Sequence, residues 1–256
     1  MMIDILAVLS GSVVGFFLGL LGGGGSIMAV PLLLYVVGIG DAHLAIGTSA
    51  VAVAVSAAFS LALHAKRGTV KWPCAIAFAV SGSIGALLGA ALGKAIDGQK
   101  LILAFAAAMV GVGISMLIRK SDEGNTDVHI SPKLAIRLIP TGLVTGVASG
   151  FFGIGGGFLI VPGLIGATNM TMLNAIGSSL VAVTAFGAAT AASYAFSGLV
   201  VWKLALLFTV GGAVGGALGQ VMGHKLAVKK GVLNKIFAAL IFVTAIYMVS
   251  QTLLVP

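Results

Sequence analysis

Charged residues are scarce in this chain. Its 256 residues include only 6 acidic and 14 basic side chains, and Asp, Glu, Lys and Arg together make up 8% of the sequence. A soluble protein of this length needs a largely polar surface to cover its core, and this composition does not supply one. The scarcity of charge therefore excludes an ordinary soluble domain. The net charge of +8 does not indicate a nucleic-acid partner either, because the basic residues lie in short loops between apolar segments.

Cysteine and buried acidic residues are lacking as well. Cys74 is the only cysteine, which excludes an intramolecular disulfide and a cysteine-based metal centre. No apolar segment carries Asp or Glu near its middle, so a carboxylate site for protons or sodium ions is not expected. We therefore expect neither a metal nor another cofactor.

Long apolar segments dominate the rest of the sequence. The apolar fraction is 59% and the mean hydropathy is +1.20. Runs of about 18 residues or more, long enough to cross a bilayer as a helix, recur along the whole chain. The sequence predicts an all-α, polytopic helical membrane protein surrounded by the lipid bilayer. The expected helices cover residues 3–21, a short arm to about 38, 43–64, 72–93, 101–118, 134–152, 155–167, 172–195, 202–223 and 232–253.

The sequence contains an internal duplication. The segment GLLGGGGSIMAVP (19–31) resembles GFFGIGGGFLIVP (150–162), and their prolines lie 131 positions apart. AIGTSAVAV (45–53) then matches AIGSSLVAV (175–183), 130 positions later. Matched motifs in the same order are typical of a duplicated unit. They predict one membrane domain made of an N-terminal repeat at 1–120, a linker at 121–133 and a C-terminal repeat at 134–256.

The basic residues predict how the repeats are oriented. If each glycine segment lies within one membrane crossing, the Lys and Arg residues divide almost evenly between the two sides. If each glycine segment instead turns the chain back, each repeat is a glycine-broken hairpin followed by three transmembrane helices. One side then has only Lys94, Lys100 and Lys203, as the positive-inside rule favours for an outer face. The other side has Lys66, Arg67, Lys71, Arg119, Lys120, Lys133, Arg137, Lys225, Lys229, Lys230 and Lys235.

This distribution predicts two inverted repeats in the plasma membrane. Both chain termini are expected outside the cytoplasm, and the central linker inside it. Inverted repeats are the architecture of many secondary transporters, whose binding site lies near the midplane where interrupted helices of the two repeats meet.

The glycine segments predict an anion site at this position. Consecutive glycines are poor helix formers, and a turn at membrane depth exposes backbone amides that need a protein or wet environment. The arm after each turn is expected to begin a helix at about Ser26 or Gly157, where free amides and the helix dipole favour an anion. Ser26 is also placed to cap that helix. We therefore predict a midplane site for a small anionic substrate.

Hydroxyl side chains add to this site. Thr48 and Ser49 follow a glycine early in one helix, and serines occupy the same places in the second repeat. Each hydroxyl could alternatively bond back to a carbonyl of its own helix, and Asn174 could serve as a helix cap. The candidate substrate-binding residues are Gly22, Gly23, Gly24, Gly25, Ser26, Thr48, Ser49, Gly153, Gly155, Gly156, Gly157, Asn174, Ser178 and Ser179.

Close helix packing is the alternative explanation of the glycines, since small residues let membrane helices approach. It is the explanation we favour for the later glycines Gly82, Gly85, Gly89, Gly212, Gly215 and Gly219.

The paired motifs resemble a known family. GLLGGGGSIMAVPLLL and GFFGIGGGFLIVPGLI, followed by AIGTS and AIGSS, are similar to the TauE/SafE family of sulfite exporters, and the resemblance covers both halves of the chain. It implies a transporter, not an enzyme, that exports sulfur-containing anions such as sulfite or organosulfonates. The residues themselves indicate only a small anion.

Other functions compete with this interpretation. A passive anion channel also uses a wet path lined by glycine, and only saturable flux distinguishes the two. An intramembrane serine hydrolase is suggested by Ser149 in GVASGFFG, but the G-x-S-x-G spacing and a mid-membrane histidine are missing. The sequence leaves open whether the chain forms a homodimer.

Overall fold

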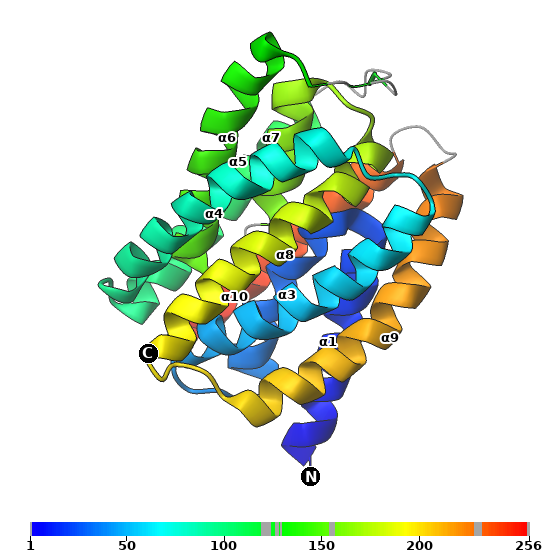
Figure 1. Ribbon diagram of the computed structural model, residues 1–256. Coiled ribbons are helices and arrows are strands. Elements are labelled where there is room, and N and C mark those ends of the chain that lie inside the picture. The colour runs from blue at the N-terminus through cyan, green and yellow to red at the C-terminus, as the bar shows by residue number, and fades with distance from the viewer. Residues whose placement is uncertain are drawn as a thin grey trace.

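The computed structural model describes residues 2–118, 124, 125, 128, 130–153, 157–227 and 232–254, and every named element in them is a helix (Figure 1). The first half contains α1 (Met2–Leu21), the 3₁₀ helix η1 (Gly22–Met28), α2 (Ala29–Pro31), the π-helix η2 (Leu32–Val36), α3 (Ala42–Lys66), α4 (Trp72–Lys94) and α5 (Gly98–Ile118). The second half contains α6 (Pro132–Phe152), α7 (Gly157–Thr168), α8 (Met172–Phe196), α9 (Trp202–Ala227) and α10 (Val232–Leu254).

Eight of the described helical segments are long and apolar enough to cross a membrane. Met2–Val36 counts as one of them because helical residues continue through the first glycine segment, and α7 is a shorter apolar helix. The chain is therefore an all-α, multi-pass membrane protein, which confirms the expected fold class.

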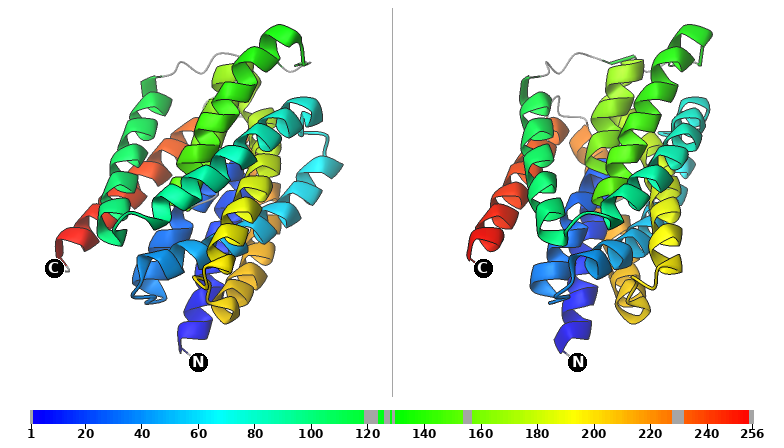
Figure 2. Two further views of the ribbon diagram at one scale, coloured as in Figure 1. Left: turned by 60° about the vertical axis from the view of Figure 1, so that its left-hand side comes forward. Right: turned by 90° about the vertical axis from the view of Figure 1, so that its left-hand side faces the viewer.

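The bundle has two ends, which we call the proximal end, where α1 begins, and the distal end, where α6 begins. At the proximal end, Asp4 forms a 2.7 Å ion pair with Lys203 at the start of α9. Lys94, the last residue of α4, donates a 2.9 Å hydrogen bond to Ser197 Oγ after α8 at the same end. Figure 2 shows that α1 and α6 run in opposite directions through the bundle.

Each glycine segment turns the chain back toward the end from which it came. α1 begins at the proximal end, and the chain is back at that end by His43. The Nε2 of His43 lies 3.2 Å from the carbonyl oxygen of Ile96, in the α4–α5 turn that follows Lys94 at the proximal end. α7 returns along α6 in the same way. Gly166, near the end of α7, lines one groove with Arg137, near the start of α6.

Glycines bring helices of the two halves into backbone contact. A Cβ on Gly15 of α1 would overlap the carbonyl oxygen of Gly212 in α9, and a Cβ on Gly146 of α6 would overlap that of Gly82 in α4. The remaining late glycines meet backbone atoms of α1 or α6 in the same manner. Close packing was the explanation favoured for these glycines, and it is confirmed. The glycines concerned are Gly82, Gly85, Gly89, Gly212, Gly215 and Gly219.

Candidate functional site

The two glycine segments begin with a residue in the left-handed conformation. Gly22 follows α1 with a φ of +64°, and Gly153 follows α6 with a φ of +69°. A side chain with a Cβ is strained at such angles, so each reversal requires glycine at this position. We call residues 22–26 tip 1 and residues 153–157 tip 2. The predicted site residues Gly155 and Gly156 lie outside the described residues, so tip 2 is described by Gly153 and Gly157.

The two tips touch each other inside the bundle. A Cβ on Gly157 would overlap the carbonyl oxygen of Gly23, and a Cβ on Gly23 would lie 2.7 Å from the Cα of Gly157. Gly22, Gly23, Gly24, Gly25 and Ser26 are all buried. The contact leaves no room for a solute between Gly23 and Gly157, so this conformation is closed at the tips.

Each tip also rests on a helix from the other half. A Cβ on Gly22 would lie 2.5 Å from the Oγ of Ser179 in α8, and one on Gly153 would overlap the Ile46 side chain in α3. The amide of Gly23 donates a 3.0 Å hydrogen bond to Ser179 Oγ. Ser179 and Ser49 both donate back to the carbonyl three residues earlier, over 2.7 Å and 2.8 Å. Both predicted serines therefore lie at the level of the tips, and Ser179 bonds a tip directly.

Thr48 and Ser178 fix the starts of two other helices. Thr48 Oγ1 accepts a 2.9 Å hydrogen bond from the amide of Val201, just before α9. Ser178 Oγ accepts an equally long bond from the amide of Lys71, just before α4. These turns lie at opposite ends of the bundle. In this conformation the two hydroxyls therefore position α9 and α4, and they do not converge on one point.

Ser26 does not cap a helix, which corrects the sequence prediction. Its hydroxyl donates a 2.8 Å hydrogen bond to the carbonyl oxygen of Gly23, and residues from Gly22 onward already form the 3₁₀ helix η1. Glycines have no side chains that would crowd the tight 3₁₀ turn, and the hydrogen bond from the Ser26 hydroxyl joins the two ends of that turn. The first arm therefore has no α-helix starting at Ser26, whereas α7 does have Gly157 as its first described residue.

Asn174 is not the cap of α8 either. Thr171 is the N-cap, and its Oγ1 accepts a 3.4 Å hydrogen bond from the amide of Asn174. Asn174 lies in the first turn of α8, only two residues before Ile176, which contacts tip 1. Its place close to the tip keeps it among the candidate ligands.

Two buried phenylalanines cover the tips, and the sequence motifs predict neither of them. A Cβ on Gly24 would overlap the ring of Phe237 in α10. Phe105 in α5 packs against Phe152 and Phe158, which flank tip 2, with ring centroids 5.5 Å and 5.6 Å apart. Neither ring is near a glycine motif in sequence. Only the approach of α5 and α10 to the tips brings them into the site.

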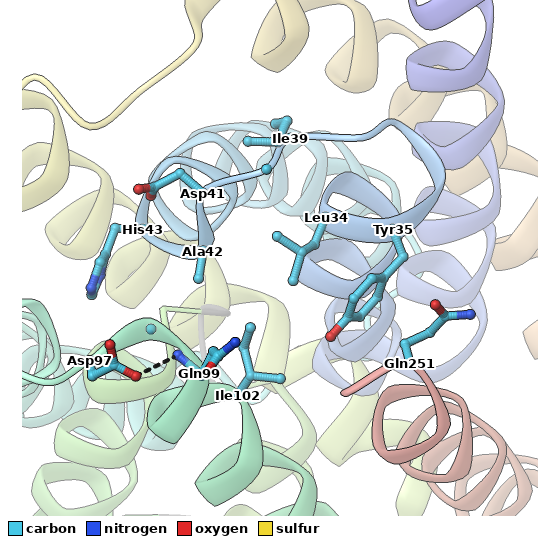
Figure 3. A pocket seen from close by; sticks show the side chains of 12 residues that line it. Leu34, Tyr35, Ile39, Asp41, Ala42, His43, Asp97, Gln99, Ile102 and Gln251 are labelled. Carbon is cyan, nitrogen blue, oxygen red and sulfur yellow. Dashed lines mark hydrogen bonds between the residues drawn. The ribbon is translucent and has the colours of Figure 1, made fainter. Parts of the chain in front are cut away.

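A separate cavity of about 580 Å³ opens at the proximal end, away from the tips. Figure 3 shows Tyr35 and Gln251 on one side of it, and Asp41, His43 and Asp97 on the other. Asp41 accepts the amide of Leu44 over 2.9 Å, and Asp97 accepts that of Gln99 over 3.1 Å, so each carboxylate caps a helix. The lining of this cavity contains these two carboxylates and no Lys or Arg, a composition that does not suit an anion.

The geometry does not support the hydrolase alternative. Ser149 is fully buried, and its Oγ forms no hydrogen bond within the described residues. A serine nucleophile needs a base within hydrogen-bond distance. Within the described residues there is also no group of three His, Cys, Asp or Glu side chains that could hold a metal ion.

Comparisons with known proteins agree with a transport role. The family model described as "Sulfite exporter TauE/SafE" matches residues 7–248. A "probable membrane transporter protein" of Xylella fastidiosa (strain Temecula1) is 49% identical over 246 residues, which cover 96% of this chain and 94% of that protein. One of Haemophilus influenzae is 29% identical over 201 residues, which cover 76% of this chain and 74% of that protein. No solved structure matches this chain.

Proposed function

Because the chain belongs to the sulfite exporter TauE/SafE family and is a membrane transporter, we propose that it is a secondary transporter that exports small sulfur-containing anions such as sulfite or organosulfonates. The substrate binds between tip 1 and tip 2 when they separate.

The contact between Gly23 and Gly157 is the observation that carries this proposal. Two chain reversals from oppositely directed hairpins meet there, although 134 positions separate the two glycines in sequence. Interrupted segments that meet within the bundle are where transporters with repeats bind their substrates. A scaffold for packing alone has no need for two buried chain reversals that touch.

Main-chain groups give the proposed site its preference for anions. α7 is 12 residues long and begins at tip 2, and the first amides of an α-helix have no acceptor within the helix. These amides and the positive end of the helix dipole favour a negative charge without a lysine or arginine in the membrane. The hydroxyls of Ser49 and Ser179 lie at the same level. Each donates to a carbonyl of its own helix in the closed conformation, so each must exchange that bond for one to the oxyanion when the tips separate.

Alternating access follows from an inverted relationship of the two repeats. The opposite directions of α1 and α6 support this relationship (Figure 2). Matched contacts support it as well, since Gly15 meets Gly212 as Gly146 meets Gly82. Exchanging the conformations of two such repeats converts an inward-open site into an outward-open one. The closed tips then correspond to a state between these two.

The distal end faces the cytoplasm in this proposal. Positive charge near membrane helices marks the cytoplasmic side. Among the Lys and Arg residues that the structure describes, only Lys94, Lys100 and Lys203 lie at the proximal end. An inside-negative membrane potential then drives anion export with about 2.3 kcal/mol per charge per 100 mV. The basic residues at the distal end within the described part are Lys66, Arg67, Lys71, Lys133, Arg137, Lys225 and Lys235.

Flux from liposomes tests the proposal. The purified chain is reconstituted, and efflux of sulfite, sulfoacetate, thiosulfate, sulfate and a carboxylate is compared. Saturable efflux of a sulfur anion, stimulated by the same anion outside, is expected. Linear flux without such stimulation would instead identify a passive channel, and no flux of any of these anions would contradict the proposed substrate class.

A further inference from the structure

A groove of about 470 Å³ lies between α6 and α7 near the distal end. Small residues and helix-breaking prolines line it. Pro140 and Pro162 interrupt the backbone hydrogen bonds of their helices. Gly166 is exposed and has no side chain to fill the space, whereas a Cβ on Gly163 would lie 3.3 Å from Thr145 Oγ1 of α6. Other residues that line the groove are Arg137 and Thr141.

The groove opens toward hydrocarbon. Beyond Arg137, large exposed side chains on this side of α6 are apolar, with Ile136 73% and Val144 69% exposed. Such side chains on a membrane-spanning helix face the lipid tails rather than water. The space beside the exposed Gly166 is therefore open to an acyl chain.

The distal part of the groove is polar. Arg137 lies five residues after Pro132, so it is about 8 Å along α6 from its start at a rise of about 1.5 Å per residue. An arginine at this depth extends its guanidinium to the headgroup level, where the planar donor group matches a phosphate. Pro140 has no amide, so the carbonyl oxygen of Ile136 lacks its usual helical donor and can accept from a headgroup.

The first repeat does not have these features. At the positions matching Arg137, Gly163 and Gly166, it has Leu6, Leu32 and Tyr35. The first repeat thus has an apolar residue in place of the basic one, and large side chains in place of both glycines. The combination of an arginine with unfilled space therefore occurs only in the second repeat, between these matched positions. It lies at the basic, distal end of the bundle, where an anionic leaflet is expected.

We propose that this groove is a binding site for one anionic phospholipid of the leaflet at the distal end. The phosphate pairs with Arg137, and one acyl chain lies against Gly166. The lipid holds α7 against α6 in the second hairpin. The proposal does not depend on which anion the chain transports.

Lipid retention by the purified full chain tests the site. The delipidated protein in detergent is titrated with phosphatidylglycerol or phosphatidylcholine, and bound lipid is counted by native mass spectrometry. We expect selective retention of phosphatidylglycerol, and a loss of about tenfold in its apparent affinity in Arg137→Leu, which installs the residue of the first repeat. Gly166→Tyr keeps the charge and fills the groove, and it is expected to release the lipid as well.

A charge-matched variant separates a built site from general attraction. Lys100→Leu removes one exposed basic residue at the proximal end and leaves the groove intact. It is expected to bind phosphatidylglycerol as the unmodified chain does. Equal losses in Lys100→Leu and Arg137→Leu, or full retention in Gly166→Tyr, would overturn the proposal. If Arg137→Leu does not fold, Arg137→Lys is the variant to titrate instead. It is expected to bind phosphatidylglycerol with intermediate affinity because it keeps the charge but not the planar donor group.

Discussion

The amide of Gly23 donates a 3.0 Å hydrogen bond to the hydroxyl of Ser179, which joins tip 1 to α8 from the other half of the chain. The same hydroxyl donates to the carbonyl oxygen of Ile176, over 2.7 Å. A single buried side chain thus satisfies a tip amide and holds the tip against a long helix. We therefore expect a movement of α8 to be transmitted to tip 1 through this side chain.

Ser179→Ala is expected to destabilise tip 1. It leaves the buried amide of Gly23 without its acceptor, at a cost of about 1–3 kcal/mol. We expect a lower unfolding temperature in detergent and slower anion efflux from liposomes. Ser179→Thr keeps the hydroxyl and should retain most of both properties. If alanine and threonine reduce efflux equally, the hydrogen bond is not the cause.

Gly24 and Phe237 are expected to be energetically coupled. A Cβ on Gly24 would overlap the Phe237 ring, so Gly24→Ala should impair folding and efflux, and Phe237→Leu should restore part of the loss by making room. A double-mutant cycle on stability and efflux measures the coupling. Gly111→Ala is the control, since nothing lies within 4 Å of a Cβ there. Additive effects of the two changes would show that the ring does not press on the tip.

Gly146→Leu is expected to separate α6 from α4. The new side chain would overlap the backbone of Gly82, and backbone atoms cannot move aside as a flexible side chain can. We expect aggregation or a large loss of thermal stability, measured by gel filtration and unfolding in detergent. Gly111→Leu, in a helical position facing open space, should behave as the unmodified chain. A stable Gly146→Leu would refute the backbone contact.

The orientation of the chain can be tested by cysteine labelling. In a Cys74→Ala background, Phe196→Cys is exposed at the proximal end and Lys133→Cys at the distal end. A thiol reagent that cannot cross the membrane should label Phe196→Cys in intact cells and Lys133→Cys only after lysis. The opposite pattern would place the basic, distal end outside and contradict the positive-inside assignment.

Efflux is expected to respond to membrane potential. An anion that leaves a compartment with a negative interior gains about 2.3 kcal/mol per charge per 100 mV. Potassium diffusion potentials can be imposed on liposomes with valinomycin. A negative interior should accelerate sulfite efflux, and a positive interior should slow it. Efflux that is unchanged by voltage would indicate exchange without net charge movement and would contradict uncoupled export of the anion.

The sequence predicted the helices closely because their signals are local. Apolar length placed a helix at 43–64, where the structure has Ala42–Lys66, and another at 202–223, where it has Trp202–Ala227. Small residues at matched positions predicted close helix packing, which the contact of Gly15 with Gly212 confirms. Prediction was weaker at tip 1, because the choice between an α-helix and a 3₁₀ helix at Gly22–Met28 depends on what packs around it.

The site contacts could not be predicted from local sequence. Thr48 and Ser178 occupy matched positions in the sequence, which predicted two hydroxyls at one site. In the structure their hydroxyl oxygens accept hydrogen bonds from the amides of Val201 and Lys71, in turns far away along the chain. Phe237 contacts tip 1 although more than 200 positions separate the two. Such partners are not encoded by spacing along the chain.

By itself, the sequence determined that this chain is an all-helical membrane protein with two matched glycine motifs, because scarce charge and long apolar runs leave no other stable arrangement in a bilayer. Only the tertiary structure decided that Gly23 lies against Gly157, that Ser179 bonds the tip amide, and that two phenylalanines cover the tips. The physical reason is that helix formation is satisfied within each segment, whereas these contacts depend on how separate segments pack together.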